Sequence, residues 1–331
     1  MNTRQYLWVA CMTSITILSA CGDDSSSAAD SSIENPDAGA SSDELRACPA
    51  DAPDRDFMSE PCCYRKSNAD DPSEAELRLA FLRPTAPTTL ANNTLVEALL
   101  SAAFDEERFN WLVRISGITG EGGEVAVTTG FGRRSGSGAD VSFAFVDGDA
   151  PAADGDPNRW NPLSTTGTLT VVDGDESNLA LGPVVDTITL PIVEIDSDEV
   201  SLELPLASLE LTNMALTENR SCVGERTDPT YTPVASLVGY LPVEDTKNAN
   251  IDLGTVQSSV CKILAGIAVS SDEDCNTRDQ TKWSVPPDSS CTGTGCNFGD
   301  CTPADCNAWL LTGEFAAQGV EVTGNEATGD Q

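Results

Sequence analysis

Cysteine is the residue type whose spacing most strongly suggests chemistry in this chain. Cys291, Cys296, Cys301 and Cys306 follow one another at intervals of five residues. Thiolates at such intervals can bind zinc, whereas paired cysteines form disulfides. A step of five places successive side chains on different faces of a helix or strand, and glycines lie between these cysteines, so we expect them on a loop. The chain contains no C-x-x-C, which disfavours a redox centre.

The first residues of the chain indicate the compartment in which these cysteines reside. Arg4 gives a positive start, and residues 7–18 form an apolar run that is short for a membrane span but suits a secretory signal. The run ends in Leu18-Ser19-Ala20-Cys21. This sequence resembles the lipobox of bacterial lipoproteins. An ordinary signal peptide or a short membrane anchor is the alternative.

The lipobox resemblance implies that the signal peptide, residues 1–20, is removed and that the thiol of Cys21 carries a diacylglycerol. The acyl chains would then be the contact with the lipid bilayer. Residue 22 is Gly rather than the Asp that retains lipoproteins at the inner membrane of enteric bacteria. We therefore expect a lipid-anchored protein of the cell envelope, with the outer membrane favoured over the inner one.

An exported chain with an even number of cysteines is typical of a disulfide framework. When Cys11 and Cys21 are set aside, the remaining candidates number ten: Cys48, Cys62, Cys63, Cys222, Cys261, Cys275, Cys291, Cys296, Cys301 and Cys306. Three precede residue 64, so full pairing requires at least one bond from that group to a cysteine beyond residue 220. A Cys-only metal site is the less favoured alternative.

Histidine is absent from the sequence. Its absence excludes Ser-His-Asp and Cys-His catalysis and every histidine-ligated metal site. Paired carboxylates could still catalyse glycoside hydrolysis. However, 53 Asp and Glu residues produce such pairs by chance, and only five Trp and four Tyr are available to stack on sugars.

One acidic stretch resembles the start of a calcium-binding loop. Asp154, Asp156 and Asn158 place oxygen ligands at alternating positions, as calcium loops do. The sixth position from Asp154 is not Gly and the twelfth is not Glu, so the pattern stops at three ligands. Asp-Gly turns explain the same residues. Calcium is therefore a weak expectation, and no other cofactor is expected.

The overall charge restricts the partners. The chain has 18 Lys and Arg against 53 Asp and Glu, a formal net charge of −35. Nucleic-acid phosphates require a basic surface, and anionic lipid headgroups attract one, so we expect no nucleic acid and no direct docking on lipid headgroups.

The elements that position these residues follow from hydrophobic periodicity. Short alternating segments separated by Gly and Asp turns predict a mainly β chain, an antiparallel β-sandwich or a jelly-roll-like domain. Two short helices are expected, one at 94–105 with a Thr94–Glu97 capping box and one at 255–268. The predicted segments are a disordered tether at 21–46, a Cys-rich collar at 47–72, a β-rich domain at 73–322 with a Cys-rich loop at 271–306, and a disordered tail at 323–331.

These observations favour a non-catalytic binding or structural role for a lipid-anchored, disulfide-stabilised β-domain whose ligand is unknown. A carboxylate-dependent glycoside hydrolase and a calcium-dependent adhesin are the alternatives. The composition also resembles that of uncharacterised Cys-rich exported lipoproteins of Gram-negative bacteria, a resemblance that implies no activity.

Overall fold

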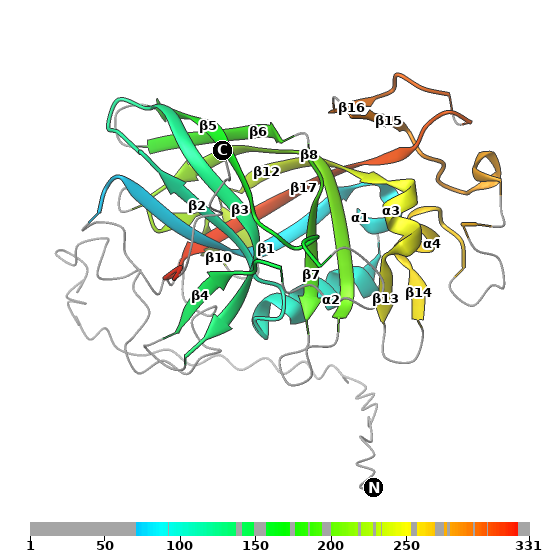
Figure 1. Cartoon of the computed structure of the whole chain (residues 1–331), viewed down its shortest axis with the longest axis horizontal. Helices are drawn as coiled ribbons and strands as arrows, with labels where there is room; N and C mark the ends of the chain where they lie inside the picture. Colours follow the sequence, from blue (N-terminus) through cyan, green and yellow to red (C-terminus); the bar gives the residue numbers. More distant parts are fainter. Residues whose placement is uncertain are drawn as a thin grey trace, which may run out of the picture. The chain divides into compact units, whose positions relative to one another are not determined.

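Antiparallel strands account for most of the chain in the computed structural model (Figure 1). The structure describes residues 71–323 apart from short internal stretches, the longest of which are 149–156, 194–199 and 269–274. The predicted mainly β, antiparallel fold is confirmed. The predicted signal peptide and tether lie outside the described residues, as do all of the collar except its last two residues and all of the tail except its first.

Eight strands form a continuous ring of antiparallel pairs. In order around the ring they are β1 (Glu74–Ala86), β2 (Trp111–Ser116), β3 (Gly123–Ser135), β5 (Leu163–Val172), β6 (Glu176–Val184), β8 (Val200–Leu216), β12 (Ala235–Pro242) and β17 (Ala308–Gly319). The ring closes because β17 pairs with β1 as well as with β12. A β-sandwich has two separate sheets that face each other. Here the two facing layers are opposite walls of a single sheet.

The remaining strands extend this sheet or form a separate pair. They are β4 (Ser142–Phe145), β7 (Ile188–Val193), β9 (Cys222–Val223), β10 (Glu225–Thr227), β11 (Thr230–Thr232), β13 (Asn250–Asp252), β14 (Gln257–Ser259), β15 (Ser289–Thr292) and β16 (Gly295–Phe298). The first half of β8 leaves the ring and pairs with β7 and β13. The β15–β16 hairpin joins the start of β17.

Alternating burial explains why the ring encloses a core. In β12, every second residue from Ala235 to Leu241 is buried and the residues between them are partly exposed. The buried residues of opposite walls belong to one hydrophobic cluster, which includes Leu77, Val113, Val127, Leu181, Leu211, Leu237, Leu311 and Phe315. Burial of each such side chain stabilises the fold by about 1.5–3 kcal/mol before the cost of ordering the chain.

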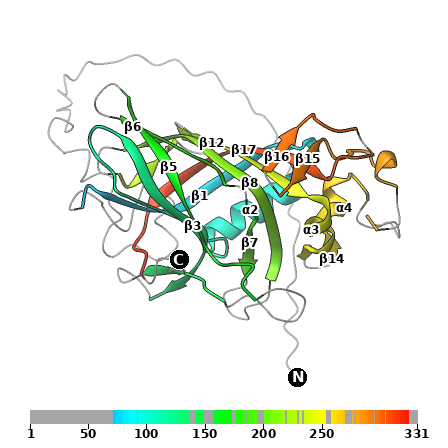
Figure 2. The ribbon, with the colours of Figure 1, turned by 45° about the horizontal axis from the view of Figure 1, so that its top comes forward.

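Four short α-helices occur among the described residues: α1 (Thr88–Ala91), α2 (Thr94–Asp105), α3 (Val243–Asn248) and α4 (Val260–Leu264). A 3-10 turn, η3, spans Gln280–Lys282. Figure 2 and Figure 1 agree that α3, α4, β15 and β16 gather at one end of the sheet.

One predicted helix agrees with the structure more closely than the other. The first spans the predicted residues, but its N-cap is Asn93, whose side chain accepts from the backbone N–H groups of Leu95 and Val96. The Thr94 capping box was therefore wrong by one residue. The second prediction, 255–268, was too long, because residues 257–259 form strand β14 and α4 ends at Leu264.

A buried ion pair lies on the outer side of β1 and β2. The Arg114 guanidinium donates to Glu76 Oε1 at 2.9 Å from Nη2 and 3.1 Å from Nε. Glu76 is only 3% exposed. The pair also holds the end of the described chain, since Val322 donates its N–H to Glu76 Oε2 at 3.2 Å and its carbonyl accepts from Arg114 at 2.6 Å.

A second buried cation, Arg78, joins β1 to the end of α2. Its Nε donates to Asn110 Oδ1 at 2.7 Å and its Nη2 to the carbonyl of Phe104 at 2.9 Å. The guanidinium lies 5.7 Å from the centre of the Phe143 ring, so strand β4 covers it. The two buried charged residues of β1, Glu76 and Arg78, therefore both have hydrogen-bonding partners on other segments of the chain.

Two ion pairs of β1 differ in burial, and this difference gives a stability test: Glu76–Arg114 is largely buried and Arg83–Glu314 is exposed. Glu76→Gln should lower the free energy of unfolding by about 3 kcal/mol, the lower end of the range for a buried pair broken at one partner, because Arg114 stays partly exposed. The control, Glu314→Gln, breaks the exposed pair with Arg83 and should cost no more than about 1 kcal/mol. Denaturant unfolding measures both, and equal losses would contradict the assignment.

Candidate functional site

A cavity of about 420 Å³ opens between the β15–β16 hairpin and the start of α3. Five separate segments of the chain line it, and their residues are Asp186, Thr187, Ala207, Pro242, Glu244, Cys291, Thr292, Gly293, Cys296 and Asn307. Its volume lies within the range of small-molecule sites. It combines carboxylates, hydroxyls and an amide with an apolar surface from Ala207, Pro242 and a disulfide.

The disulfide Cys291–Cys296 forms one wall of the cavity. The two cysteines lie directly opposite each other in the antiparallel ladder of β15 and β16, with Cα atoms 4.0 Å apart. Their expected position on a loop was therefore wrong. A step of five separates two side chains only within a single helix or strand, whereas here a turn around Gly293 reverses the chain between these cysteines.

Asn307 holds the hairpin against the start of β17. Its Oδ1 accepts from the N–H of Cys291 at 2.6 Å, and its Nδ2 donates to the carbonyl of Cys291 at 2.8 Å. The carbonyl of Asn307 also accepts from the N–H of Val243 at 2.8 Å. One residue therefore connects the hairpin, the ring of strands and α3.

Ser208 holds the other strand of the hairpin. It lies where the β8–β12 register shifts, and its φ of 47° is in the left-handed region that few non-glycine residues occupy. Its Oγ accepts from the N–H of Cys296 at 3.0 Å, and the residue is buried. Such irregularities redirect a side chain out of the normal alternation, which is what brings this hydroxyl to the hairpin.

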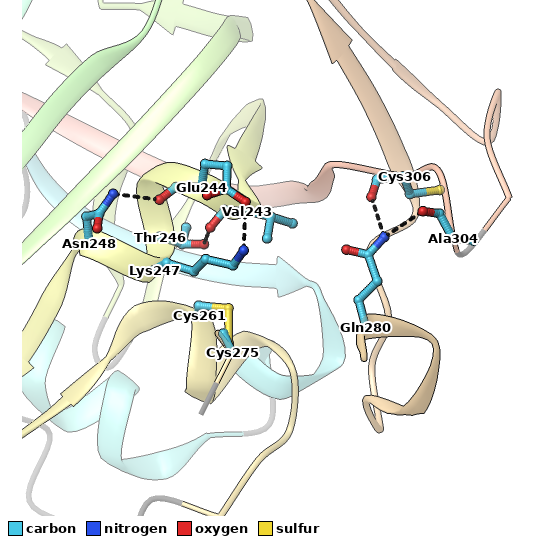
Figure 3. A network of polar contacts seen from close by, with 10 residues as sticks. All are labelled: Val243, Glu244, Thr246, Lys247, Asn248, Cys261, Cys275, Gln280, Ala304 and Cys306. Carbon is cyan, nitrogen blue, oxygen red and sulfur yellow. Dashed lines mark hydrogen bonds and ion pairs between the residues drawn. A yellow bond between two sulfur atoms is a disulfide. The ribbon is translucent and has the colours of Figure 1, made fainter. Parts of the chain in front are cut away.

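The acidic side of the cavity is supported by the polar contacts of α3 (Figure 3). Lys247 Nζ pairs with Glu244 Oε1 at 2.6 Å, and Asn248 Nδ2 donates to the Glu244 carbonyl at 3.0 Å. Thr246 Oγ1 donates to the carbonyl of Val243 at 2.9 Å. All three contacts join residues of α3. They hold the backbone and the carboxylate of Glu244 in place at the edge of the cavity.

Two further contacts stabilise the region beside α3. Cys261 and Cys275 form a disulfide that ties α4 to the segment after it. The Gln280 side chain donates to the carbonyls of Ala304 and Cys306 at 3.1 and 3.0 Å, which holds the loop closed by the Cys301–Cys306 disulfide (Figure 3).

The electrostatic surroundings of this end of the sheet are acidic. Asp186 and Glu244 are both exposed, and none of the residues that line the cavity is Lys or Arg. Lys247 pairs with Glu244, so these three charged groups together carry a net negative charge. Burial raises the pKa of Asp245, with a further contribution from the adjacent Glu244. Burial also raises the pKa of Tyr240 on β12, and the charges of Asp288 and Glu210 add to the shift. The site therefore favours cationic over anionic ligands.

The expected disulfides form among the described cysteines. The pairs are Cys261–Cys275, Cys291–Cys296 and Cys301–Cys306, and Cys222 is also disulfide-bonded. Cys21, Cys48, Cys62 and Cys63 also lie outside it. Disulfides persist in oxidising compartments, so these bonds indicate an extracytoplasmic environment.

The predicted calcium ligands lie mostly outside the described residues, so calcium binding stays a prediction. Asp154 and Asp156 lie outside the described residues, whereas Asn158 lies in an exposed turn next to Trp160. Within the described part of the chain, no group of three or more Cys, Asp or Glu side chains is placed to hold a metal ion. Asn158 is not among the residues that line the cavity.

The residues that build the cavity were largely missed by sequence reasoning. Only its two cysteines were singled out. Asp186, Glu244, Asn307 and Ser208 belong to no local motif, because they come from different segments and meet only through strand pairing. A pattern within a single segment carries no signal for such a site.

Comparisons with models of protein families, with curated proteins and with solved structures found no match to this chain. Among the described residues, no helix is long and apolar enough to span a membrane.

The environment of Tyr240 gives a titration test. Because burial and nearby carboxylates raise its pKa above 10.0, its phenolate should form later than that of an ordinary tyrosine. The stabilisation linked to this proton is complete below pH 10 and is lost as the pH rises further. Ultraviolet absorbance should show a late component that Tyr240→Phe removes and Glu210→Gln shifts to lower pH. Glu314→Gln is the control, and an unchanged late component in Tyr240→Phe would contradict the assignment.

The bond of Cys222 gives a second test. Six of the seven described cysteines pair among themselves, so the partner of Cys222 must come from the remainder of the chain. We expect non-reducing peptide mapping to join the Cys222 peptide to one that contains Cys48, Cys62 or Cys63. The three local disulfides serve as internal controls. A free Cys222 thiol, or a bond between two copies of the chain, would refute this expectation.

Proposed function

We propose that this chain is a lipid-anchored domain of the cell envelope, most closely associated with the outer membrane, that binds a small polar ligand and catalyses no reaction. The cavity beside the hairpin is the proposed binding site. The observation that carries this proposal is the convergence of five separate segments on that cavity, with hydrogen-bonding groups around a wall fixed by a disulfide.

The proposed anchor rests on the lipobox at Leu18–Cys21 together with the disulfides. An exported, disulfide-bonded domain with an acidic surface is repelled by anionic lipid headgroups, so acyl chains on Cys21 would have to hold it at the membrane. A single chain gives only reversible attachment, and two or three give a stable one.

A glycoside hydrolase is the second candidate, because two carboxylates, Asp186 and Glu244, line the same cavity. Two results would separate it from a binding protein. Turnover of a glycan that is lost in both Asp186→Asn and Glu244→Gln would establish catalysis, whereas saturable binding without turnover would support the proposed role. The calcium-dependent adhesin is not favoured by any described contact.

Replacement of the acylated residue tests the anchor. Cys21→Ala removes the thiol that would carry the lipid, so the protein should move from the membrane fraction to the soluble extracytoplasmic fraction or persist as an uncleaved precursor. Metabolic labelling with a fatty acid should mark the unmodified chain and not the variant. The control is Cys11→Ala, which alters a cysteine within the signal and should leave labelling unchanged. Equal membrane association and labelling in Cys21→Ala would exclude the lipoprotein assignment.

A further inference from the structure

We propose that the Cys291–Cys296 disulfide is a thiol-exchange site, which small thiols reach through the cavity and open before the other described disulfides. The proposal concerns a reversible modification of the hairpin. It does not depend on the lipid anchor or on the identity of a ligand.

Access distinguishes this disulfide from its neighbours. Cys291 and Cys296 are both partly exposed, and both line the cavity. In contrast, Cys261 is 0% exposed and Cys275 is 4% exposed. A thiolate must approach a sulfur atom along the line of the bond that it breaks, so buried disulfides react slowly. The hairpin disulfide therefore offers the most open approach.

The Cys301–Cys306 disulfide is the closest competitor, because it spans the same sequence separation of 5. Cys301 is partly exposed, but Cys306 is 3% exposed and Gln280 holds its carbonyl. Neither cysteine lines the cavity. An attacking thiol therefore finds one sulfur shielded, and this disulfide lies outside the lining of the cavity.

The hairpin is built to remain in place after the bond opens. Four residue pairs join β15 to β16, and Asn307 and Ser208 hold the two cysteines by their backbone groups. The bond closes a very short loop, so its loss releases little chain entropy. The two thiols would stay opposite each other, and the disulfide could form again without refolding.

The exchange uses two equivalents of a small thiol. The thiolate of the first attacks the sulfur of one cysteine, which forms a mixed disulfide while the other cysteine leaves as a thiolate and takes up a proton. A second thiolate attacks the sulfur of the bound thiol, which releases the small-molecule disulfide and the second cysteine thiol. Two small thiols are thereby oxidised and one protein disulfide is reduced.

The charge of the cavity selects among thiols. Asp186 and Glu244 line it, and Lys247 pairs with Glu244 at 2.6 Å, so the net charge of these three groups is negative. Carboxylates close to the path of attack repel an anionic thiol and attract a cationic one, an effect that weakens with salt. The preferred co-reactant is therefore a small thiol that carries an amine.

Limited reduction followed by alkylation tests the order of opening. The full exported chain is treated with 2-mercaptoethanol for increasing times, the thiols are blocked, and the alkylated cysteines are identified by mass spectrometry. We expect Cys291 and Cys296 to be blocked several-fold sooner than Cys301 and Cys306. Equal rates, or earlier reaction at Cys301 and Cys306 or at Cys261 and Cys275, would overturn the proposal.

A charge series tests access through the cavity. At equal thiolate concentration and low salt, cysteamine should open the hairpin disulfide several-fold faster than 2-mercaptoethanol, and mercaptoacetate several-fold slower. The double variant Asp186→Asn, Glu244→Gln removes both carboxylates and the partner of Lys247, so it should abolish or reverse this difference. A matched control, Asp105→Asn with Glu121→Gln, neutralises two exposed carboxylates away from the cavity and should leave it unchanged. An equal response to all three thiols would overturn the proposed route.

A third measurement tests whether the hairpin survives opening. The double variant Cys291→Ser, Cys296→Ser should keep the cooperative unfolding transition of the unmodified chain. Removal of the reductant from the partly reduced chain should restore the Cys291–Cys296 bond in the peptide map. Loss of the folded state in the variant, or re-formation of mismatched pairs, would show that this bond is structural and not exchangeable.

Discussion

The pairing of β17 with both β1 and β12 is the contact on which the rest of the structure depends. It closes the ring of strands and so lets opposite walls share one core. A closed sheet also has no free edge along the closure, which protects it from pairing with other chains. The same strand begins one residue after Asn307, so the closure that builds the core also places the residue that holds the hairpin and α3.

The distribution of charge inside the domain complements its acidic exterior. Many of the few cations are used in contacts within the protein: Arg78 and Arg114 beside β1, Arg134 with the buried Glu107, and Arg159 with Glu203. Each such contact removes a positive charge from the surface while the excess of carboxylates stays outside. The cavity shows the same imbalance, because its two carboxylates are exposed and Lys247, which pairs with Glu244, offsets only one of them.

Local sequence signals identified the elements much better than their assembly. Hydrophobic and polar residues alternate over 200–206, and the apolar residues resume at 209–216. The two stretches form one strand, because Ser208 adopts an unusual φ and allows the ladder to continue past an irregularity. The helix at 94–105 was found because its apolar spacing lies within one segment. The helix at 255–268 was overestimated, because the helical spacing of apolar residues runs across positions 257–259, which form strand β14.

The candidate site was harder to predict for a physical reason. Closure of the ring requires β8 to pair with β12 and β1 with β17, and such pairings between distant segments leave no periodicity in the sequence. The cavity depends on those pairings, so Asp186, Glu244 and Asn307 had no visible connection before the structure. Cysteine parity is a constraint on the whole chain, and it predicts a long-range bond that local spacing does not indicate.

The position of β17 in the chain also constrains how the protein is made. The first strand of the ring, β1, pairs with β17, which is synthesised more than two hundred residues later. Until that partner arrives, β1 and β12 each present an unpaired edge, and the core between them is open to water. Folding of this domain therefore cannot proceed strand by strand to completion as the chain emerges. It ends in a single late step, and any product that stops before residue 308 lacks the strand that makes the sheet continuous.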